Sequence, residues 1–303
     1  MNTYAQKTDG EKMLADLHCH TKLSDGSLGI EELITLAAST GVSTIGITDH
    51  DSMAATLRGK IIGQRHGVNV IPGVELSTVD PATGRNVHLL CYLADHPDRL
   101  EGLCKRISLA RRRAGQYMVL RVAKRFRLTP EFIMRSTSGS TNIYKQHIMH
   151  ALMDAGISDA IFSNLFDELF IRPGENNVKV PIKYPDCHEV LQEIHEAGGI
   201  AVLAHPFEYD SIRVMEELVR EGLDGVEVYH PSADAEKTEF LLNYARKNDL
   251  VITGGSDFHG MYNSRKVTVG SYGLEQQELD ALMNYKTKRK RREAAAKKAA
   301  ANG

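Results

Sequence analysis

The stretch Ile45-Gly-Ile-Thr-Asp-His-Asp51 is a short apolar run that ends in a histidine between two aspartates. The same order of apolar run and ligand-type side chain occurs at Ala15-Asp-Leu-His-Cys-His-Thr21, and it returns at Ile252-Thr-Gly-Gly-Ser-Asp-Phe-His259. Short apolar runs rich in Val and Ile predict buried β-strands. We therefore expect strands whose C-terminal ends carry imidazole and carboxylate groups.

Runs of this kind recur along the chain, and helical patterns separate most of them. Strand–helix alternation predicts parallel strands in an α/β fold, either a (β/α) barrel or an open doubly wound sheet. We favour the barrel, because ligand-type residues follow nearly every run and the reactive face of a barrel is the C-terminal end of its strands. The predicted strands are 13–17, 44–48, 69–76, 87–93, 200–204, 225–229 and 250–254, and the helices between them are 30–40, 53–66, 188–197, 211–221 and 234–248.

The alternation breaks between residues 100 and 184, where helical patterns cover 106–127, 143–155 and 160–169. Long insertions in barrels usually arise at the loop face. We therefore predict a helical cap over the barrel mouth, with a peripheral packing subdomain as the alternative. The predicted division is barrel at 13–100 and 187–283, helical insertion at 101–186, and basic C-terminal tail at 284–303.

The composition is that of a globular protein of 303 residues. No apolar run approaches the ~20 residues of a membrane span, and the polar start of the chain does not resemble a signal peptide. The four cysteines lie far apart and form no C-x-x-C pair. Together these features predict reduced thiols in a cytoplasmic protein without a membrane partner.

Positive charge is concentrated in two segments, although the formal net charge is −2. Residues 284–303 contain eight Lys/Arg and one Glu, which leaves about −9 on the remainder, and residues 105–127 contain nine Lys/Arg. Basic segments can attract polyanions such as RNA. We prefer a solvated helix end for the Ala/Lys-rich tail, while the orientation of the other segment is open.

The ligand-type residues have a chemical reason to act together. His18 and His20 point the same way because strand side chains alternate, and paired imidazoles chelate divalent metals. A carboxylate at Glu75, which closes an apolar run, needs a charged partner or a metal. Asp49 and Asp51 are both expected to orient His50 by accepting its second ring N–H, with a cap on the following helix as the alternative role for one of them. The other ligand-type residues at or near strand ends are Asp25, His88, His205, His230, Asp257 and His259.

In this order the motifs H-x-H-x₄-D-G, T-D-H-D, G-V-E, A-H-P and G-S-D-F-H resemble the polymerase and histidinol phosphatase (PHP) superfamily over about residues 13–273. The chain is most similar to bacterial metal-dependent phosphoesterases with a helical insertion. Members of that subgroup act on AMP or 3′,5′-bisphosphonucleotides, and some trim RNA from the 5′ end. The resemblance implies a distorted (β/α)₇ barrel with two or three divalent metal ions per chain, and the ligands suit Mn, Fe or Zn.

The resemblance also implies roles for individual residues. The first metal would be held by His18, His20, Glu75 and Asp257, the second by Glu75, His88 and His205, and the third by Asp25, His50 and His259. Lys145 and His147 stand where related insertions have Arg-x-His before a helix, and together with Arg265 they are expected to contact phosphate. His230 is the candidate acid for the leaving group, and His205 and Asp257 complete the expected catalytic residues.

These residues predict a metal-dependent phosphoric ester hydrolase, in which a hydroxide bridging two metals attacks a nucleotide phosphomonoester. The alternatives are a 5′–3′ exonuclease on short RNA, a histidinol-phosphate phosphatase and a metal-dependent amidohydrolase. A metal-binding module without catalysis is the non-enzyme alternative, and it would be expected to have lost ligands. The expected partners are a phosphorylated small molecule, foremost a nucleotide, and short RNA.

Overall fold

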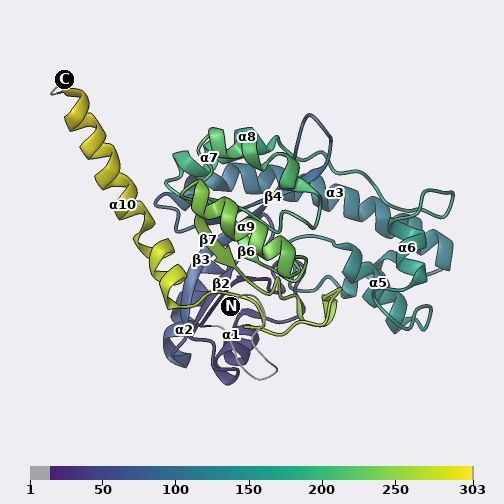
Figure 1. Cartoon of the computed structure of the whole chain (residues 1–303). Helices are drawn as coiled ribbons and strands as arrows, with labels where there is room; N and C mark the ends of the chain where they lie inside the picture. Colours follow the sequence, from purple (N-terminus) through teal and green to yellow (C-terminus); the bar gives the residue numbers. More distant parts are fainter. Residues whose placement is uncertain (1–13, 302–303) are drawn as a thin grey trace.

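A computed structural model describes residues 14–301 as a mixed α/β protein around one seven-stranded sheet (Figure 1). Every predicted strand is present, although residue 13, the predicted start of the first, lies outside the described residues. The strands occur in chain order across the sheet. They are β1 (Ala15–Cys19), β2 (Thr44–Ile47), β3 (Asn69–Val79), β4 (Asn86–Tyr92), β5 (Ile200–Leu203), β6 (Gly225–Tyr229) and β7 (Val251–Gly254).

The sheet curls until its two edges meet. The Phe258 carbonyl accepts a hydrogen bond from the His20 N–H at 2.9 Å, and the Phe258 N–H donates to the His18 carbonyl at 3.3 Å. These bonds join β1 to the segment that follows β7. The result is a nearly closed barrel, which confirms the predicted fold class and places the ligand-bearing ends of β1 and β7 side by side.

One strand runs against the others. β4 pairs antiparallel with both β3 and β5, whereas the remaining neighbours pair in parallel. The prediction of parallel strands was wrong here, because residues 80–85 are too short for the crossover that parallel pairing requires. The reversal distorts the barrel, and it brings the beginning of β4, with His88, to the face where the other strands end.

Amphipathic helices cover the outside of the barrel. In α7 (Cys187–Glu196) the buried residues Val190, Leu191 and Ile194 recur at helical spacing, and the Asp186 side chain caps the first turn by accepting from the His188 N–H at 2.9 Å. The other outer helices are α1 (Ile30–Ser39), α2 (Thr56–His66), α8 (Met215–Arg220), which follows the 3₁₀ turn η2 (Ser211–Arg213), and α9 (Ala235–Lys247).

The chain between β4 and α7 contains helices and loops, and most of it lies to one side of the barrel in Figure 1. It has its own apolar cluster, which includes Val122, Ile148 and Leu169. One short helix here was not predicted, although Pro130 at its start and a Thr129 cap on the Phe132 N–H at 3.2 Å are typical N-terminal signals. The segment comprises η1 (Pro97–Leu100), α3 (Glu101–Phe126), α4 (Pro130–Arg135), α5 (Lys145–Asp154) and α6 (Asn164–Phe170).

Residues 284–301 of the basic tail belong to the long helix α10 (Gln276–Ala301), which projects from the body in Figure 1, and residues 302–303 lie outside the described residues. Near its beginning the Tyr285 hydroxyl donates to Asp224 at 2.8 Å, and Lys286 pairs with Asp95 at 2.8 Å. RNA binding by this helix stays a prediction. None of the helices described between residues 14 and 301 combines the length and hydrophobicity needed to cross a membrane.

Gly255 lies where the two edges of the barrel meet, and its close approach to His18 can be tested. A Cβ added there would lie 2.4 Å from both the Cβ and the backbone N of His18, so a side chain requires β1 or its neighbour to move. We expect Gly255→Ala to lower the free energy of unfolding by about 1–3 kcal/mol in urea denaturation. Gly102→Ala is the control, because a Cβ at Gly102 meets nothing within 4 Å. Equal stability of the two variants would contradict this close approach.

Candidate metal centre

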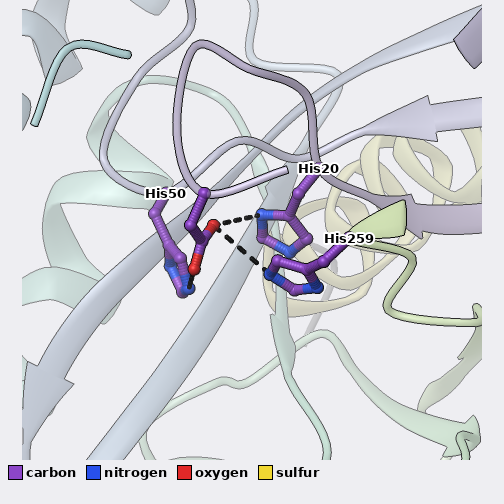
Figure 2. A group of neighbouring side chains, drawn as sticks. His20, His50 and His259 are labelled. Carbon is purple, nitrogen blue, oxygen red and sulfur yellow. Dashed lines mark ion pairs between the residues drawn. The ribbon is translucent and has the colours of Figure 1, made fainter. Parts of the chain in front are cut away.

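The strand ends bring the predicted metal ligands together at the mouth of the barrel. Figure 2 shows the imidazoles of His20, His50 and His259 lying close to one another. Three groups at this mouth offer ligand atoms within 4.8 Å of one another. They are His20, Asp25, His50 and His259; His18, His20, Glu75 and Asp257; and His50, Glu75 and His88.

Glu75, which is 1% exposed, lies at the middle of this arrangement. Each of its carboxylate oxygens faces a separate set of imidazoles, which is the geometry of a carboxylate that bridges two cations. His205 belongs to none of these three groups, but it contacts the site through Glu75. Oε1 lies 2.6 Å from His88 Nδ1 and 2.8 Å from His205 Nε2, whereas Oε2 lies 3.3 Å from His18 Nε2, 3.2 Å from His20 Nε2 and 3.2 Å from His50 Nδ1.

The pKa shifts show that the site requires positive charge. Burial alone would raise the pKa of the Glu75 carboxyl, but the imidazoles of His50, His88 and His18 hold it well below its usual range. Burial would lower the pKa of His20, but the carboxylates of Asp257 and Glu75, 3.1 and 3.2 Å from its Nε2, raise it to about 10. A proton on His20 thus supplies charge that a metal ion could supply instead.

His50 is shifted in the opposite direction. Burial lowers its pKa to about 3, and the attraction of Glu75 and Asp25 does not compensate for this desolvation. A neutral imidazole is the form that binds a metal. The group of His20, Asp25, His50 and His259 therefore combines a neutral His50 with Asp25, whose pKa is lowered against its burial, chiefly by His259.

Unsatisfied atoms test whether these residues fit metal ions. Within residues 14–301, several buried side-chain atoms without a hydrogen-bond partner belong to this site, among them His18 Nε2, His20 Nε2 and His50 Nδ1. An unsatisfied buried polar group costs about 1–3 kcal/mol, which a cation at the site would offset. Imidazole and carboxylate ligands suit Mn, Fe or Zn. The residues therefore fit divalent metals, while the assignment of each ligand to one ion stays a prediction.

A buried carboxylate behind the site, Glu227, was not assigned a role from the sequence. It lies on β6, is 0% exposed, contacts His18 Nδ1 at 2.9 Å and accepts from the His205 backbone N–H at 2.8 Å. Such a contact fixes the tautomer and orientation of a metal-binding imidazole. The signal was present, because a glutamate within an apolar strand needs a partner.

The prediction that Asp49 and Asp51 orient His50 was wrong. Asp49 accepts from the Thr21 N–H at 2.7 Å, and Asp51 accepts from the Ser77 N–H at 2.9 Å. Asp49 precedes His50 on an extended segment and so points away from its ring, and Asp51, whose backbone turns at this point, directs its carboxylate to Ser77 and Arg111. Asp49 thereby holds the loop after β1 in place, and Asp51 holds β3.

Three of the seven described non-glycine residues with positive φ lie in the same region. Asp51, His205 and Asp257 all have positive φ, at 53°, 26° and 51°. Residues other than glycine in sparsely populated backbone regions cost roughly 1–3 kcal/mol each, and they persist where function requires their geometry. The strained residues include two of the predicted metal ligands and the immediate neighbour of a third, His50.

The metal-ligand cluster opens into a cavity of about 1830 Å³. Residues of both the barrel and the helical segment line it, including Lys145, Lys179 and Arg265, and Arg265 also pairs with Glu208 at 2.8 Å. His147 does not line this cavity. It is buried, and its Nδ1 accepts from the Tyr144 N–H at 3.4 Å.

His230 lies at the edge of the cavity with its ring orientation fixed. The Ser232 N–H donates to Nδ1 at 3.0 Å, so the neutral ring carries its proton on Nε2. This Nε2 is buried, has no hydrogen-bond partner in the described chain, and lies 3.5 Å from Asp257 Oδ2. The residue therefore presents a proton donor beside the metal-ligand cluster.

This fold and site define a barrel protein whose mouth holds clusters of His, Asp and Glu side chains able to bind divalent metal. A family model for the PHP domain matches residues 16–199, and the chain belongs to this family. The predicted family membership is thereby confirmed, as is the enzyme class of phosphoric ester hydrolase.

Characterised relatives span most of the chain. It is 35% identical to the phosphoribosyl 1,2-cyclic phosphate 1,2-diphosphodiesterase of Eggerthella lenta over 82% of this chain and 95% of the relative. It is 31% identical to the 5′-3′ exoribonuclease Rnm of Escherichia coli, over 82% and 85%. It is 28% identical to the 3′,5′-nucleoside bisphosphate phosphatase of Chromobacterium violaceum, over 80% and 86%.

A solved structure shares the architecture. The crystal structure of a protein from Bifidobacterium adolescentis, described as a metal-dependent phosphoesterase, superimposes with a TM-score of 0.80 and 27% identity. The match covers 90% of this chain and 97% of that one. It confirms the distorted barrel.

The contact of Glu227 with His18 predicts a measurable role. Glu227→Gln removes the charge that orients the ring, so we expect metal affinity or phosphoesterase activity to fall about 10- to 100-fold. Metal content after dialysis and phosphate release both measure this. Glu239→Gln, at an exposed position on α9, is the control. Unchanged metal content and activity in Glu227→Gln would show that the contact is dispensable.

Proposed function

We propose that this protein hydrolyses a phosphate ester of a ribose that carries a second phosphate group, foremost a 3′,5′-bisphosphonucleotide. The observation that carries the proposal is that the cluster of predicted metal ligands opens into a large cavity lined by basic side chains. One phosphate would be cleaved at the cluster around Glu75, and the other would be held by Lys145 and Lys179. The proposal keeps the nucleotide substrate expected from the sequence and specifies what distinguishes it.

The basic side chains support a second phosphate position. Lys145 lines the cavity, and burial together with the positive charges of Lys179 and Arg111 lowers its pKa to about 8. Positive charges held close together repel one another, and low exposure to solvent strengthens this repulsion, so a bound anion stabilises them. Arg265, at the same cavity, is a further phosphate contact if its pair with Glu208 opens.

The names of the relatives support the same substrate class. A phosphoribosyl cyclic phosphate, a nucleoside bisphosphate and RNA all combine ribose with more than one phosphate group. A cyclic phosphodiester of ribose 5-phosphate is therefore the second candidate, favoured by the identity of 35% to the Eggerthella lenta enzyme. Short 5′-phosphorylated RNA is the third.

The helical segment contributes to this function as a cap. Tyr144, Lys145 and Lys179 come from residues 101–186, whereas Glu75 and His230 come from the barrel, and all of them line one cavity. The proposed division therefore assigns metal binding to the barrel and recognition of the rest of the substrate to the cap. Variation in the cap would then change substrate preference while the metal site stays the same.

Divalent metal ions supply Lewis acidity and a nucleophile from water at neutral pH. The nine predicted ligands would hold them: His18, His20, Asp25, His50, Glu75, His88, His205, Asp257 and His259. The chain's own part is positioning, because Glu75 and Asp257 lie between the imidazoles that they orient. His230 would act as the acid in its imidazolium form, in which Nδ1–H donates to the Ser232 hydroxyl 2.8 Å away and the Nε2 proton passes to the leaving oxygen.

A substrate panel tests the proposal. Metal-replete protein is given AMP, a 3′,5′-bisphosphonucleotide, ribose 5-phosphate 1,2-cyclic phosphate, histidinol phosphate and short 5′-phosphorylated RNA. We expect kcat/KM for the bisphosphonucleotide to exceed that for AMP at least tenfold, because AMP lacks the second phosphate. Asp257→Ala and a chelated sample are the controls, and both should lose activity.

The outcomes separate the candidates. Turnover of the cyclic phosphate alone would replace the nucleotide by the second candidate, and release of mononucleotides from RNA would establish the exonuclease alternative. Equal turnover of AMP and the bisphosphonucleotide would remove the second phosphate from the proposal. Release from histidinol phosphate alone would contradict it entirely.

The role of His230 has its own test. His230→Asn removes the donor, so we expect kcat on the preferred substrate to fall about 100-fold or more with little change in KM. The defect should shrink on a p-nitrophenyl ester, whose leaving group needs no proton. His66→Asn, at an exposed position on α2, is the control. An equal loss on both esters would exclude His230 as the acid.

A further inference from the structure

We infer that the Tyr144 hydroxyl and the Arg111 guanidinium form an anion-binding subsite that contacts a phosphoryl oxygen of the substrate beside the metal centre. The inference rests on the proposed function and adds two residues to it. Neither residue was singled out by the sequence motifs. Both come from the helical segment, and both line the same cavity as His50 and Glu75.

Arg111 reaches the barrel mouth from α3. It is 9% exposed, and its Nη2 donates to Asp51 Oδ2 at 3.0 Å and to Ser77 Oγ at 2.7 Å. Its Nε is buried and makes no hydrogen bond within residues 14–301. The guanidinium is therefore fixed on one side by the barrel and has donor capacity left on another.

Tyr144 lies immediately before α5 and is 5% exposed. Its ring lies between two groups of the site, with the Arg111 guanidinium 4.8 Å from the ring centroid and the His50 ring 6.1 Å away at 23°. Its hydroxyl is buried without a hydrogen-bond partner in the described chain. A phenolic hydroxyl carries its proton at neutral pH and can donate a hydrogen bond.

The two unsatisfied groups are informative because each of them destabilises the folded protein. A buried hydroxyl or N–H without a partner costs about 1–3 kcal/mol, and phenylalanine would avoid that cost at position 144. Both residues line one cavity, and the Arg111 guanidinium lies 4.8 Å from the Tyr144 ring centroid, so their unsatisfied donors indicate that the missing partner is a ligand. An acceptor with several oxygens satisfies both, and a phosphoryl group has that chemistry.

The surroundings favour an anion. The first N–H groups of α5 have no acceptor within the helix and carry partial positive charge, and Lys145 and Gln146 at this end line the cavity. Asp51 neutralises part of the Arg111 charge. A phosphoryl group bound beside the metal-ligand cluster at His50 would therefore have Tyr144 and Arg111 on its opposite side.

Tyr144→Phe tests the inference, because it removes the hydroxyl and keeps the ring stacked on His50 and Arg111. We expect kcat/KM for the best substrate of the panel to fall about 10- to 100-fold. We also expect inorganic phosphate to raise the thermal midpoint of metal-replete wild type more than that of Tyr144→Phe. Without phosphate, the midpoint of the variant should equal or exceed that of wild type, because an unsatisfied group is gone.

Tyr117→Phe is the matched control, since Tyr117 lies on α3 and is 62% exposed. It should match wild type in kinetics and in the phosphate response. A lower midpoint of Tyr144→Phe without phosphate would assign the hydroxyl a structural partner and overturn the inference. So would an unchanged phosphate response, or a wild type that phosphate does not stabilise at all.

Arg111→Lys provides a second readout, because it keeps the charge and removes the planar set of donors. We expect its phosphate response to be reduced like that of Tyr144→Phe, and a full response would exclude the guanidinium from the subsite. The phosphate experiment does not depend on which ester is cleaved. Failure of the panel with a normal phosphate response would therefore count against the proposed substrate and not against this subsite.

Discussion

The charge of one buried carboxylate, Glu75, is the constraint on which the rest of the structure depends. A carboxylate in the interior is stable only if cations or donors surround it. Here five imidazoles meet its two oxygens, and those imidazoles come from distant parts of the sequence. The barrel is the scaffold that satisfies this requirement, because its strand ends converge at one mouth.

Two departures from a regular barrel serve the same site. The reversal of β4 turns its first residues toward the mouth, so that His88 reaches Glu75 although its strand runs the other way. The contact between His18 and the segment after β7 closes the barrel where the H-x-H and D-x-H motifs meet. Glu227 on β6 contacts the predicted ligand His18, and Asp51, next to the ligand His50, accepts a hydrogen bond from Arg111 on α3. The positions of the ligands therefore depend on β6 and on the helix that lines the cavity.

The sequence predicted what depends on local pattern. The strands, most helices and the convergence of the ligand-type residues followed from apolar periodicity and from the positions of His and Asp at strand ends. It could not predict the direction of β4, which depends on a short connection and on pairing with β5. Arg111 and Tyr144 were also beyond reach, because their roles arise only when α3 and α5 are placed beside the barrel mouth. Glu227 was visible in its strand, but its partner, His18, lies 209 residues away.

The most direct test of this account is the number of metal ions bound per chain when metal-stripped protein is titrated with Mn²⁺, compared between wild type and Glu75→Gln. The account predicts more than one ion per chain in wild type and the loss of more than one in the variant, because one carboxylate serves two sets of ligands. Full metal binding by Glu75→Gln, or the loss of a single ion with the others unaffected, would contradict it.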